Sequence, residues 1–210
     1  MHYTKYIRMK MRYNPPPRVV LDGLAKLRIR IQPYYVVLEG LSGNVLQELE
    51  TQRNEYELGF LELRDMQVIG SIPFREVTYE ELVIRLEEGK MCFGAKQAGK
   101  LAAFSWCDID QFNFKGLEFP LRKNEAYLFD AYTFDAFRGR GLAPYLRYQL
   151  YKELDKLDRH RLYSISERFN ASSLKFKKKL NAQVIGSGLY IDIFKKWHFS
   201  SIGEKDILRE

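Results

Sequence analysis

The sequence predicts an α/β protein with a mixed α+β sheet, in which two central strands run parallel to each other. Residues 126–134, AYLFDAYTF, are almost entirely apolar on both faces, which is typical of a strand in the middle of a sheet. Leucines then recur at helical spacing over residues 142–157, and residues 162–166 form the next β-prone segment. A strand, a helix and a strand in this order indicate a βαβ unit, whose two strands are parallel.

A short helix and a hairpin are expected before that unit. Thr78 and Glu81 have the spacing of a capping box, which predicts the start of a helix. Residues 91–95 and 101–107 then indicate two strands, joined by a turn at residues 97–100.

Three stretches are less regular. Residues 34–38 are apolar and β-prone, while residues 45–63 have helical character that Gly59 interrupts. Residues 108–124 combine acids, aromatic residues, glycine and proline, so they predict an excursion loop or an extended hairpin. Segments of this length often carry recognition, although covering a sheet edge is an equally good explanation.

One more helix and a closing hairpin are expected towards the C-terminus. Asn170 is a good first residue for a helix, and Asn181 ends it where the left-handed conformation that Asn tolerates is often needed. Residues 182–185 and 189–194 flank the Gly-Ser-Gly of residues 186–188, which predicts a hairpin.

The composition fits one large domain, or one domain with an extension. The 210 residues are 46% hydrophobic and 29% charged, as in a soluble globular protein. No apolar run approaches the ~18 to 20 residues of a membrane span and no secretory signal is visible, so we expect a cytoplasmic protein. Two cysteines and three scattered histidines provide neither a disulfide framework nor a zinc ligand set, so we expect no metal.

The net charge of +7 is concentrated at the N-terminus. Residues 1–30 hold eight Lys and Arg residues against Asp22 alone, and the rest of the chain is balanced. This segment also carries tyrosines and other apolar residues, so one interpretation is contact with an anionic membrane surface or a partner. The other is a solvated arm packed on its own domain, which the lack of a clean helical stripe favours.

The loop before the long helix carries two cations and two glycines, Arg138, Gly139, Arg140 and Gly141. The first turn of a helix has unpartnered N–H groups and a positive dipole end, and glycines let the backbone approach a ligand closely. With two arginines beside it, this corner suits an anion such as a pyrophosphate. It is neither a P-loop nor a dinucleotide fingerprint.

Two motifs in this order resemble those of the GNAT family of acyl-CoA-dependent N-acetyltransferases. Arg138-x-x-Gly141-x-Ala143 is similar to the [QR]xxGx[GA] motif that holds the coenzyme pyrophosphate, and Asn170 with Ser173 is similar to the motif that follows. The order of helix, hairpin and central strand also matches.

This resemblance covers about residues 65–197. It implies a GNAT-like domain over residues 65–210, with residues 1–64 as a basic N-terminal extension of uncertain structure. It also implies acetyl-CoA as co-substrate, with backbone groups of Ala131 and Thr133 on the pantetheine arm. The pyrophosphate would lie on Arg138, Gly139, Arg140, Gly141, Leu142 and Ala143, and Asn170 and Ser173 would line the coenzyme from the other side.

The expected catalytic residues depart from the family pattern. The acid in GNAT enzymes is often a tyrosine seven positions after the motif Asn, and that position is Lys177 here. Lys177 belongs to a lysine run, which usually forms a solvated face, but it shares its helical face with Ser173 and apolar residues. It therefore either protonates the thiolate or pairs with an anion.

Asp130 is the first candidate for the base, because a carboxylate in a two-sided apolar strand is unusual. A structural bond from Asp130 to a neighbouring loop is an equal alternative. Tyr127 occupies the place where some relatives carry a catalytic glutamate. The family's Gly-Phe after the helix is replaced by Asn181-Ala182, which marks a divergent member.

The function expected from these observations is transfer of an acetyl group from acetyl-CoA to an amine of a small acceptor, by direct attack on the thioester. Residues 108–124 and the N-terminal region would recognise the acceptor. The alternative is a catalytically silent module that binds acyl-CoA or docks a partner. A nucleic-acid binder is a third hypothesis, and the balanced charge outside residues 1–30 argues against it.

Overall fold

The structure of the protein is a computed structural model, which describes residues 16–40, 55–73, 75, 77–194, 196–201 and 207. Residues 1–15, the start of the basic N-terminal segment, lie outside the described residues. The helices are α2 (Pro16–Lys26), α4 (Leu63–Gly70), α5 (Tyr79–Glu87), the short 3-10 helix η1 (Asp135–Phe137), α6 (Leu142–Asp155) and α7 (Ala171–Lys179). The strands are β1 (Ile29–Glu39), β2 (Glu57–Phe60), β3 (Met91–Gln97), β4 (Lys100–Asp108), β5 (Gln111–Phe114), β6 (Leu117–Pro120), β7 (Glu125–Thr133), β8 (Arg161–Glu167), β9 (Gln183–Ile193) and β10 (Trp197–Ser200).

One eight-stranded mixed sheet organises the molecule, with the strand order β10-β9-β1-β8-β7-β4-β3-β2. Among the described strands, β7 and β8 form the parallel pair, and the other neighbours are antiparallel. Helix α6 connects β7 to β8, so the predicted βαβ unit and its central parallel pair are confirmed.

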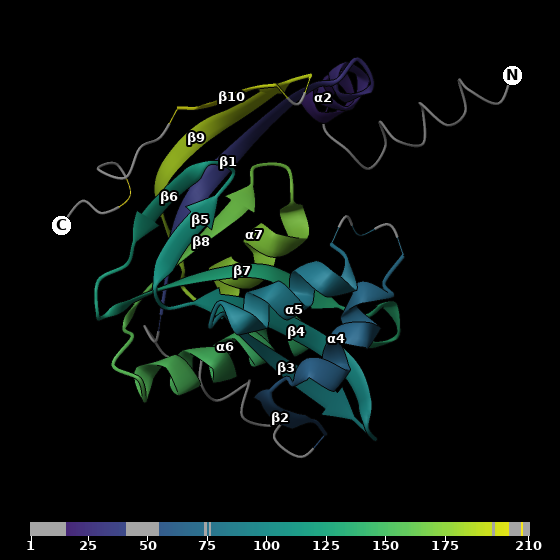
Figure 1. Ribbon diagram of the computed structural model, residues 1–210, viewed down its shortest axis with the longest axis vertical. Helices are drawn as coiled ribbons and strands as arrows, with labels where there is room; N and C mark the ends of the chain where they lie inside the picture. The colour runs from purple at the N-terminus through teal and green to yellow at the C-terminus, as the bar shows by residue number, and fades with distance from the viewer. Residues whose placement is uncertain are drawn as a thin grey trace, which may run out of the picture.

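Helices cover both faces of this sheet (Figure 1). Helices α4 and α5 pack on one face, where Met66, Ile69 and Leu82 meet Phe104 and Trp106 of β4. Helix α6 packs on the other face, where its leucines and tyrosines meet alanines of β4 and β7. Two separate apolar clusters therefore fix β4 and β7 from opposite sides.

Strand β1 lies between β8 and β9 and pairs with both. This arrangement corrects the expected closing hairpin, because β9 runs without a turn through residues 186–188. Gly188 pairs with Tyr34 and Ser187 with Tyr35, so a distant strand supplies the partners that a local turn would have supplied. The sheet thus takes strands from both sides of residue 64, and the domain division there stays a prediction.

The expected excursion of residues 108–124 is the two-stranded hairpin β5–β6. Phe112 and Phe119 of this hairpin stack on each other and join Tyr34, Tyr127 and Tyr163 in a third apolar cluster. The hairpin therefore folds over the sheet near β1 and β8. Among the described helices, none is both long enough and apolar enough to cross a membrane.

Several local signals are confirmed by the structure. Thr78 and Glu81 form both bonds of the capping box at the start of α5. Asn170 caps α7, where its side chain accepts a hydrogen bond from the backbone N–H of Ser173, and Asn181 has the left-handed φ of 56°. Helix α6 ends earlier than the leucine pattern indicated, since Leu157 lies beyond it and is exposed.

Candidate active site

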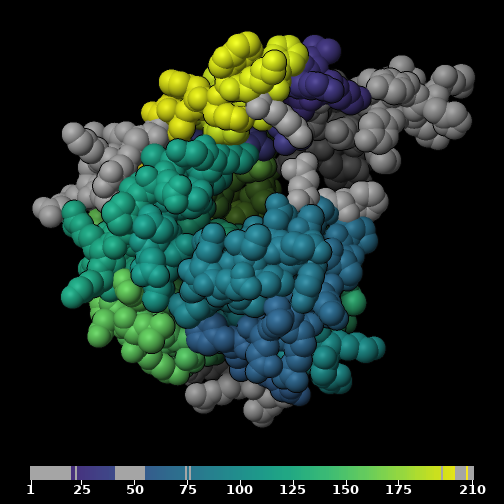
Figure 2. Space-filling view, in the orientation of Figure 1, coloured from purple at the N-terminus to yellow at the C-terminus, as the bar shows by residue number. Residues whose placement is uncertain are grey.

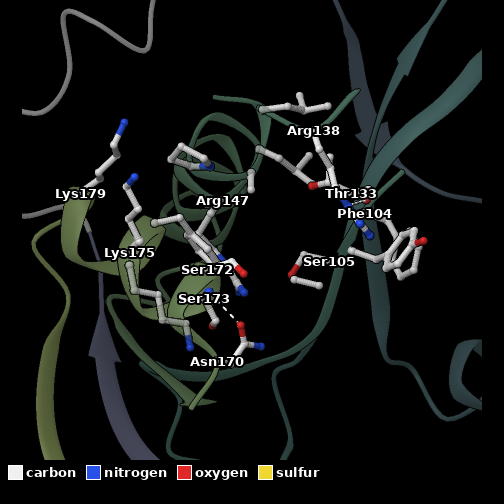
Figure 3. Close-up of a pocket in the computed structure, with 18 of the residues that line it drawn as sticks. Phe104, Ser105, Thr133, Arg138, Arg147, Asn170, Ser172, Ser173, Lys175 and Lys179 are labelled. Carbon is white, nitrogen blue, oxygen red and sulfur yellow. Dashed lines mark hydrogen bonds between the residues drawn. The ribbon is translucent and has the colours of Figure 1, made fainter. Parts of the chain in front are cut away.

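A cleft opens where the two parallel strands stop pairing. The last paired residues are Leu128 of β7 and Ser164 of β8, and beyond them the strands diverge. The cleft has a volume of about 770 Å³ and is lined by β7, by the N-terminal half of α6 and by α7. Figure 3 shows it with α7 on one side, β7 and β4 on the other and Arg147 between them. Its volume is that of a site for a small molecule or cofactor.

A bulge in β7 forms one wall of this cleft. Phe129 pairs with Trp106 and Tyr132 with Phe104, so Asp130 and Ala131 together lie opposite one residue of β4. Asp130 has a φ of 45°, which is strained for a residue other than glycine. Asp130, Ala131 and Thr133 all line the cleft.

The start of α6 forms the outer end of the cleft. Gly139 and Gly141 have φ values of 78° and 76°, and Gly141 is the residue that caps the helix. A side chain at either position would be strained, and around Gly139 there is open space where a Cβ would stand. The first turn of α6 therefore has unpartnered N–H groups, and the glycine backbone before it leaves room for a ligand beside them.

Arg138 lies folded back against its own loop. Its Nε donates to the backbone oxygen of Thr133 at 3.0 Å, and its Nη1 pairs with Asp135 at 2.7 Å. Arg138 lines the cleft, as do Gly139, Gly141, Leu142 and Ala143. Arg140 does not line it and instead lies 5.9 Å from the ring centre of Phe137.

Helix α7 forms the opposite wall, with Asn170 and Ser173 lining the cleft as the resemblance implies (Figure 3). The Ser173 hydroxyl lies 3.0 Å from that of Ser166 on β8, which ties the helix to the strand. The lining as a whole is cationic, with one carboxylate, that of Asp130, among the residues concerned. The cations are Arg138, Arg147, Lys175, Lys177 and Lys179.

Lys177 points inward from α7 to the place where β7 and β8 part. Its Nζ donates to the Ser164 hydroxyl at 2.6 Å and to the Ser166 hydroxyl at 2.7 Å, and lies 3.3 Å from the backbone oxygen of Ile165. A lysine run usually forms a solvated face. Lys177 is not part of such a face, because its side chain is only 5% exposed.

Glu39 of β1 joins this lysine to α6. One Glu39 carboxylate oxygen accepts from Ser164 and lies 3.2 Å from Lys177 Nζ. The other accepts from the Tyr151 hydroxyl and lies 3.6 Å from Arg147 Nε. The carboxylate is fully buried, and Arg147 is 4% exposed.

These contacts set the charge states of the buried groups. Burial raises the pKa of Glu39, but Arg147, Lys177 and the two hydroxyl donors outweigh burial and lower it to about 2. Burial lowers the pKa of Lys177, the charge of Glu39 raises it and that of Arg147 lowers it again, to about 8. Lys177 is therefore a cation that holds its proton weakly near neutral pH.

Asp130 is bound by two arginines on the face that α4 and α5 cover. Arg75 Nη2 donates to both of its carboxylate oxygens at 2.7 Å, and Arg85 Nη1 donates to one of them at 2.7 Å. Both guanidinium groups lie over aromatic rings, Arg75 over Phe104 and Arg85 over Trp106. These contacts favour the structural alternative for Asp130, and its role as a base stays a prediction.

Tyr127 lies away from the cleft, in the cluster under the β5–β6 hairpin. It stacks on Phe129 with ring centres 5.4 Å apart and lies 4.4 Å from the ring of Phe112. Burial raises the pKa of Tyr127, so the phenol stays protonated. This placement favours a core role, and a catalytic role for Tyr127 stays a prediction.

Reasoning from the sequence did not identify Glu39, Arg147, Arg75 or Arg85. A signal was present for two of them, because Glu39 ends an apolar β-strand and Arg147 is a charge among the apolar residues of a buried helix. No group of His, Cys, Asp and Glu side chains is arranged to hold a metal in the part of the chain that the structure describes.

A second hollow lies on the face that α4 and α5 cover. Figure 2 shows it between the β5–β6 hairpin, helix α5 and strands β9 and β10, with green residues of the β8–α7 region at its floor.

Comparison with known proteins places this fold. The family model of the acetyltransferase (GNAT) family matches residues 47–182. The structure is similar to that of a Drosophila protein, with 16% identity and a TM-score of 0.55 over 82% of this chain and 55% of the other. An acetyltransferase of the GNAT family from Novosphingobium aromaticivorans is also similar, with 17% identity and a TM-score of 0.53 over 76% of this chain and 63% of the other.

A GCN5-related N-acetyltransferase-like protein from Streptococcus suis shares 11% identity, with a TM-score of 0.54 over 81% of this chain and 66% of the other. At these identities the likeness shows a common fold. The chain spans between 55% and 66% of the lengths of these three proteins. No curated protein sequence matches it. The family match extends over nearly two thirds of the 210 residues, and the chain belongs to the GNAT acetyltransferase family.

Proposed function

We propose that this protein transfers an acetyl group from acetyl-CoA to an amine of a small acceptor, by direct attack of the amine on the thioester. The observation that carries the proposal is the cleft itself. It runs from the N-terminus of α6, which suits phosphate groups, to a buried lysine where the parallel strands part.

The described residues fit the donor. Acetyl-CoA is strongly anionic, and five of the residues that line the cleft are cations. Backbone of Gly139 and Gly141 would lie against the pyrophosphate, with Arg138 turning from Asp135 towards it. The bulge at Asp130 and Ala131 would hold the pantetheine arm along β7.

The chemistry that the donor supplies is a reactive thioester. As the amine nitrogen bonds to the carbonyl carbon, the carbon–sulfur bond breaks, the amine loses a proton and the sulfur gains one. Lys177 holds a proton at Nζ, and its pKa of about 8 lets it donate that proton near neutral pH. Ser164 and Ser166 orient this Nζ by accepting its other hydrogen bonds.

The acceptor would enter through the hollow under α5 and the β5–β6 hairpin (Figure 2). This hollow is bordered by the hairpin of the predicted recognition segment, residues 108–124. A small amine-bearing metabolite, amino acid or amino sugar suits an opening of this kind.

Thermal unfolding with and without millimolar acetyl-CoA tests the donor site. Ligand at about 100 times its dissociation constant adds roughly 2.7 kcal/mol, which raises the midpoint by about 5 to 10 °C for a chain of this size. We expect this shift with acetyl-CoA and a smaller one with ATP, which is an anion without the pantetheine arm. Arg138→Glu should abolish the shift, whereas Arg64→Glu, an exposed arginine on α4, should keep it.

An equal shift with ATP, or none with either ligand, contradicts the proposal. A shift with acetyl-CoA that is followed by no transfer to any amine would favour the catalytically silent acyl-CoA-binding module. Release of the free thiol in the presence of an amine acceptor distinguishes the enzyme from that module.

A further inference from the structure

We propose that Glu39 is a positioning residue, which holds the proton of Lys177 at the inner end of the cleft while Arg147 serves as the permanent counter-charge. The proposal deepens the acyltransferase function and rests on it for its catalytic meaning. Its structural part concerns only three buried side chains, so that part can be tested without any substrate.

Glu39 is the centre of the buried network. Its two oxygens contact Ser164 and Lys177 on one side and Tyr151 and Arg147 on the other. Three separate elements, β8, α6 and α7, are joined by this one carboxylate from β1. Both cations of the network line the cleft, so their charge is next to any ligand there.

The net charge of Glu39, Arg147 and Lys177 changes when Lys177 loses its proton. One carboxylate faces two cations, so the group has a surplus of one positive charge while Lys177 is protonated. When Lys177 gives up its proton, Glu39 and Arg147 remain as a neutral pair. A buried carboxylate without a partner is strongly unfavourable, and the guanidinium of Arg147, with its Nε 3.6 Å from Glu39, prevents that outcome.

Arg147 has a hydrogen-bond donor that the described residues leave unused. Its Nη1 is buried and makes no hydrogen bond to the residues that the structure describes, although the side chain is among those that line the cleft. Arg147 Nε lies 3.6 Å from Glu39, beyond hydrogen-bond distance, and its guanidinium carbon lies 5.8 Å from the ring centre of Phe176, so Arg147 is tied to Glu39 by charge more than by geometry. This looseness suits a group that balances charge, while the close contacts of Lys177 suit a group that must place its proton.

Glu39 comes from outside the segment that matches the family model. Strand β1 spans Ile29–Glu39, which lies outside residues 47–182 that match the family model. A strand from outside the matched segment therefore supplies the carboxylate that controls the candidate acid inside it.

The test is the titration of Lys177 followed by NMR of the 13C- and 15N-labelled lysines in the full chain, with Lys177→Met used to assign the resonance. Around Lys177 the charged or polar neighbours are Glu39 from β1, Ser164 and Ser166 from β8, and Arg147 and Tyr151 from α6. Removing the negative charge in Glu39→Gln should move the midpoint down by roughly 1 to 3 pH units. Removing the positive charge in Arg147→Met should move it up.

Glu39→Gln leaves two buried cations together and can fail to fold. The double variant Glu39→Gln/Arg147→Met avoids this, and its comparison with Arg147→Met alone isolates the charge of Glu39. We expect the double variant to titrate roughly 1 to 3 pH units lower than Arg147→Met. Glu153→Gln, a carboxylate on α6 that pairs with the exposed Lys156, is the matched control and should leave the midpoint unchanged.

An equal midpoint in Arg147→Met and the double variant overturns the proposal, as does a shift of the same sign in both single variants. The upper pH limit of kcat should follow the NMR midpoint from variant to variant. If the midpoint moves and that limit does not, Glu39 still controls Lys177, and it is the acid role in the proposed function that fails.

Discussion

Three buried charged side chains lie at the inner end of the cleft. Burying ions is expensive, and a buried ion pair is often no more stable than apolar residues of the same size. Glu39, Arg147 and Lys177 are therefore poorly explained by stability alone, and their position beside the cleft gives the functional explanation.

Glu39 should make the protein sensitive to acid. Its pKa in the folded state is about 2, against an ordinary value of 4.5, so the unfolded chain binds the proton more readily. The stability that this provides is fully present above pH 4.5 and is lost as the pH falls towards 2. The loss attributable to Glu39 is about 3 kcal/mol, which urea unfolding between pH 5 and pH 2.5 would detect.

Glu39→Gln should be less stable than the wild-type protein at pH 6, and its unfolding free energy should fall less steeply on acidification. Asp155→Asn, which removes an exposed carboxylate, should keep the wild-type slope. If Glu39→Gln and the wild-type protein have parallel pH profiles, the depressed pKa is contradicted.

Part of this site could be predicted from single residues. Lys177 was expected to point inward because it shares a helical face with Ser173, and that reasoning needs only the helical period. Glu39 could not be paired with it, because the register of β1 against β8 depends on a contact between segments far apart in the chain. Local patterns do not show which strands far apart in the chain become neighbours.

At the scale of elements, the bulge in β7 and the helix start after it form one unit. Asp130 keeps a strained backbone, and Arg75 and Arg85 anchor its side chain to the segment before α5 and to α5 itself. The two arginines thereby fix the bulge from the face opposite the cleft.

Asp130→Asn distinguishes the two roles of this residue. If Asp130 positions the bulge, we expect the free energy of unfolding to drop by about 2 kcal/mol, because hydrogen bonds to charged groups are worth about 1.5 to 3 kcal/mol. Turnover should then fall less than about tenfold. Loss of a general base would lower turnover by about 10² to 10⁴-fold with acetyl-CoA binding intact.

Chemical denaturation and steady-state kinetics on the same preparation give both numbers. Asp108→Asn is not a suitable control, because Asp108 is itself buried and accepts two backbone hydrogen bonds. Asp155→Asn again serves, since its carboxylate is exposed.

The closing hairpin failed as a prediction because pairing with a distant strand overrides its local turn signal. The Gly-Ser-Gly of residues 186–188 is a good local turn, but Tyr34, Tyr35 and Val36 of β1 pair along it and keep it extended. Glycine inside a strand often marks a bulge, and the register here shifts between Val36 and Val37. The helix starts at Thr78 and Asn170, by contrast, depend on neighbours three residues away and were correct.

At the scale of the whole molecule, strands β1 and β2 bear on where the folding unit begins, because both precede residue 64. Residues 65–210 alone would lack β1 and β2, so β8 and β9 would lose the strand between them. We expect this fragment to show no cooperative thermal transition, whereas the full chain should show one. Calorimetry or circular dichroism on both decides, and a cooperative transition in the fragment would support the boundary at residue 64.

The position of β1 also has a consequence for how the protein is made. Tyr34 on β1 contacts Ser200, 166 positions later in the chain, and β1 pairs with β9 along nearly its whole length. During synthesis the first strand leaves the ribosome long before its partners exist, and contacts between such distant segments slow folding. Strand β1 must wait until β8 and β9 have been synthesised, so Glu39 reaches Lys177 only late in the synthesis of this domain.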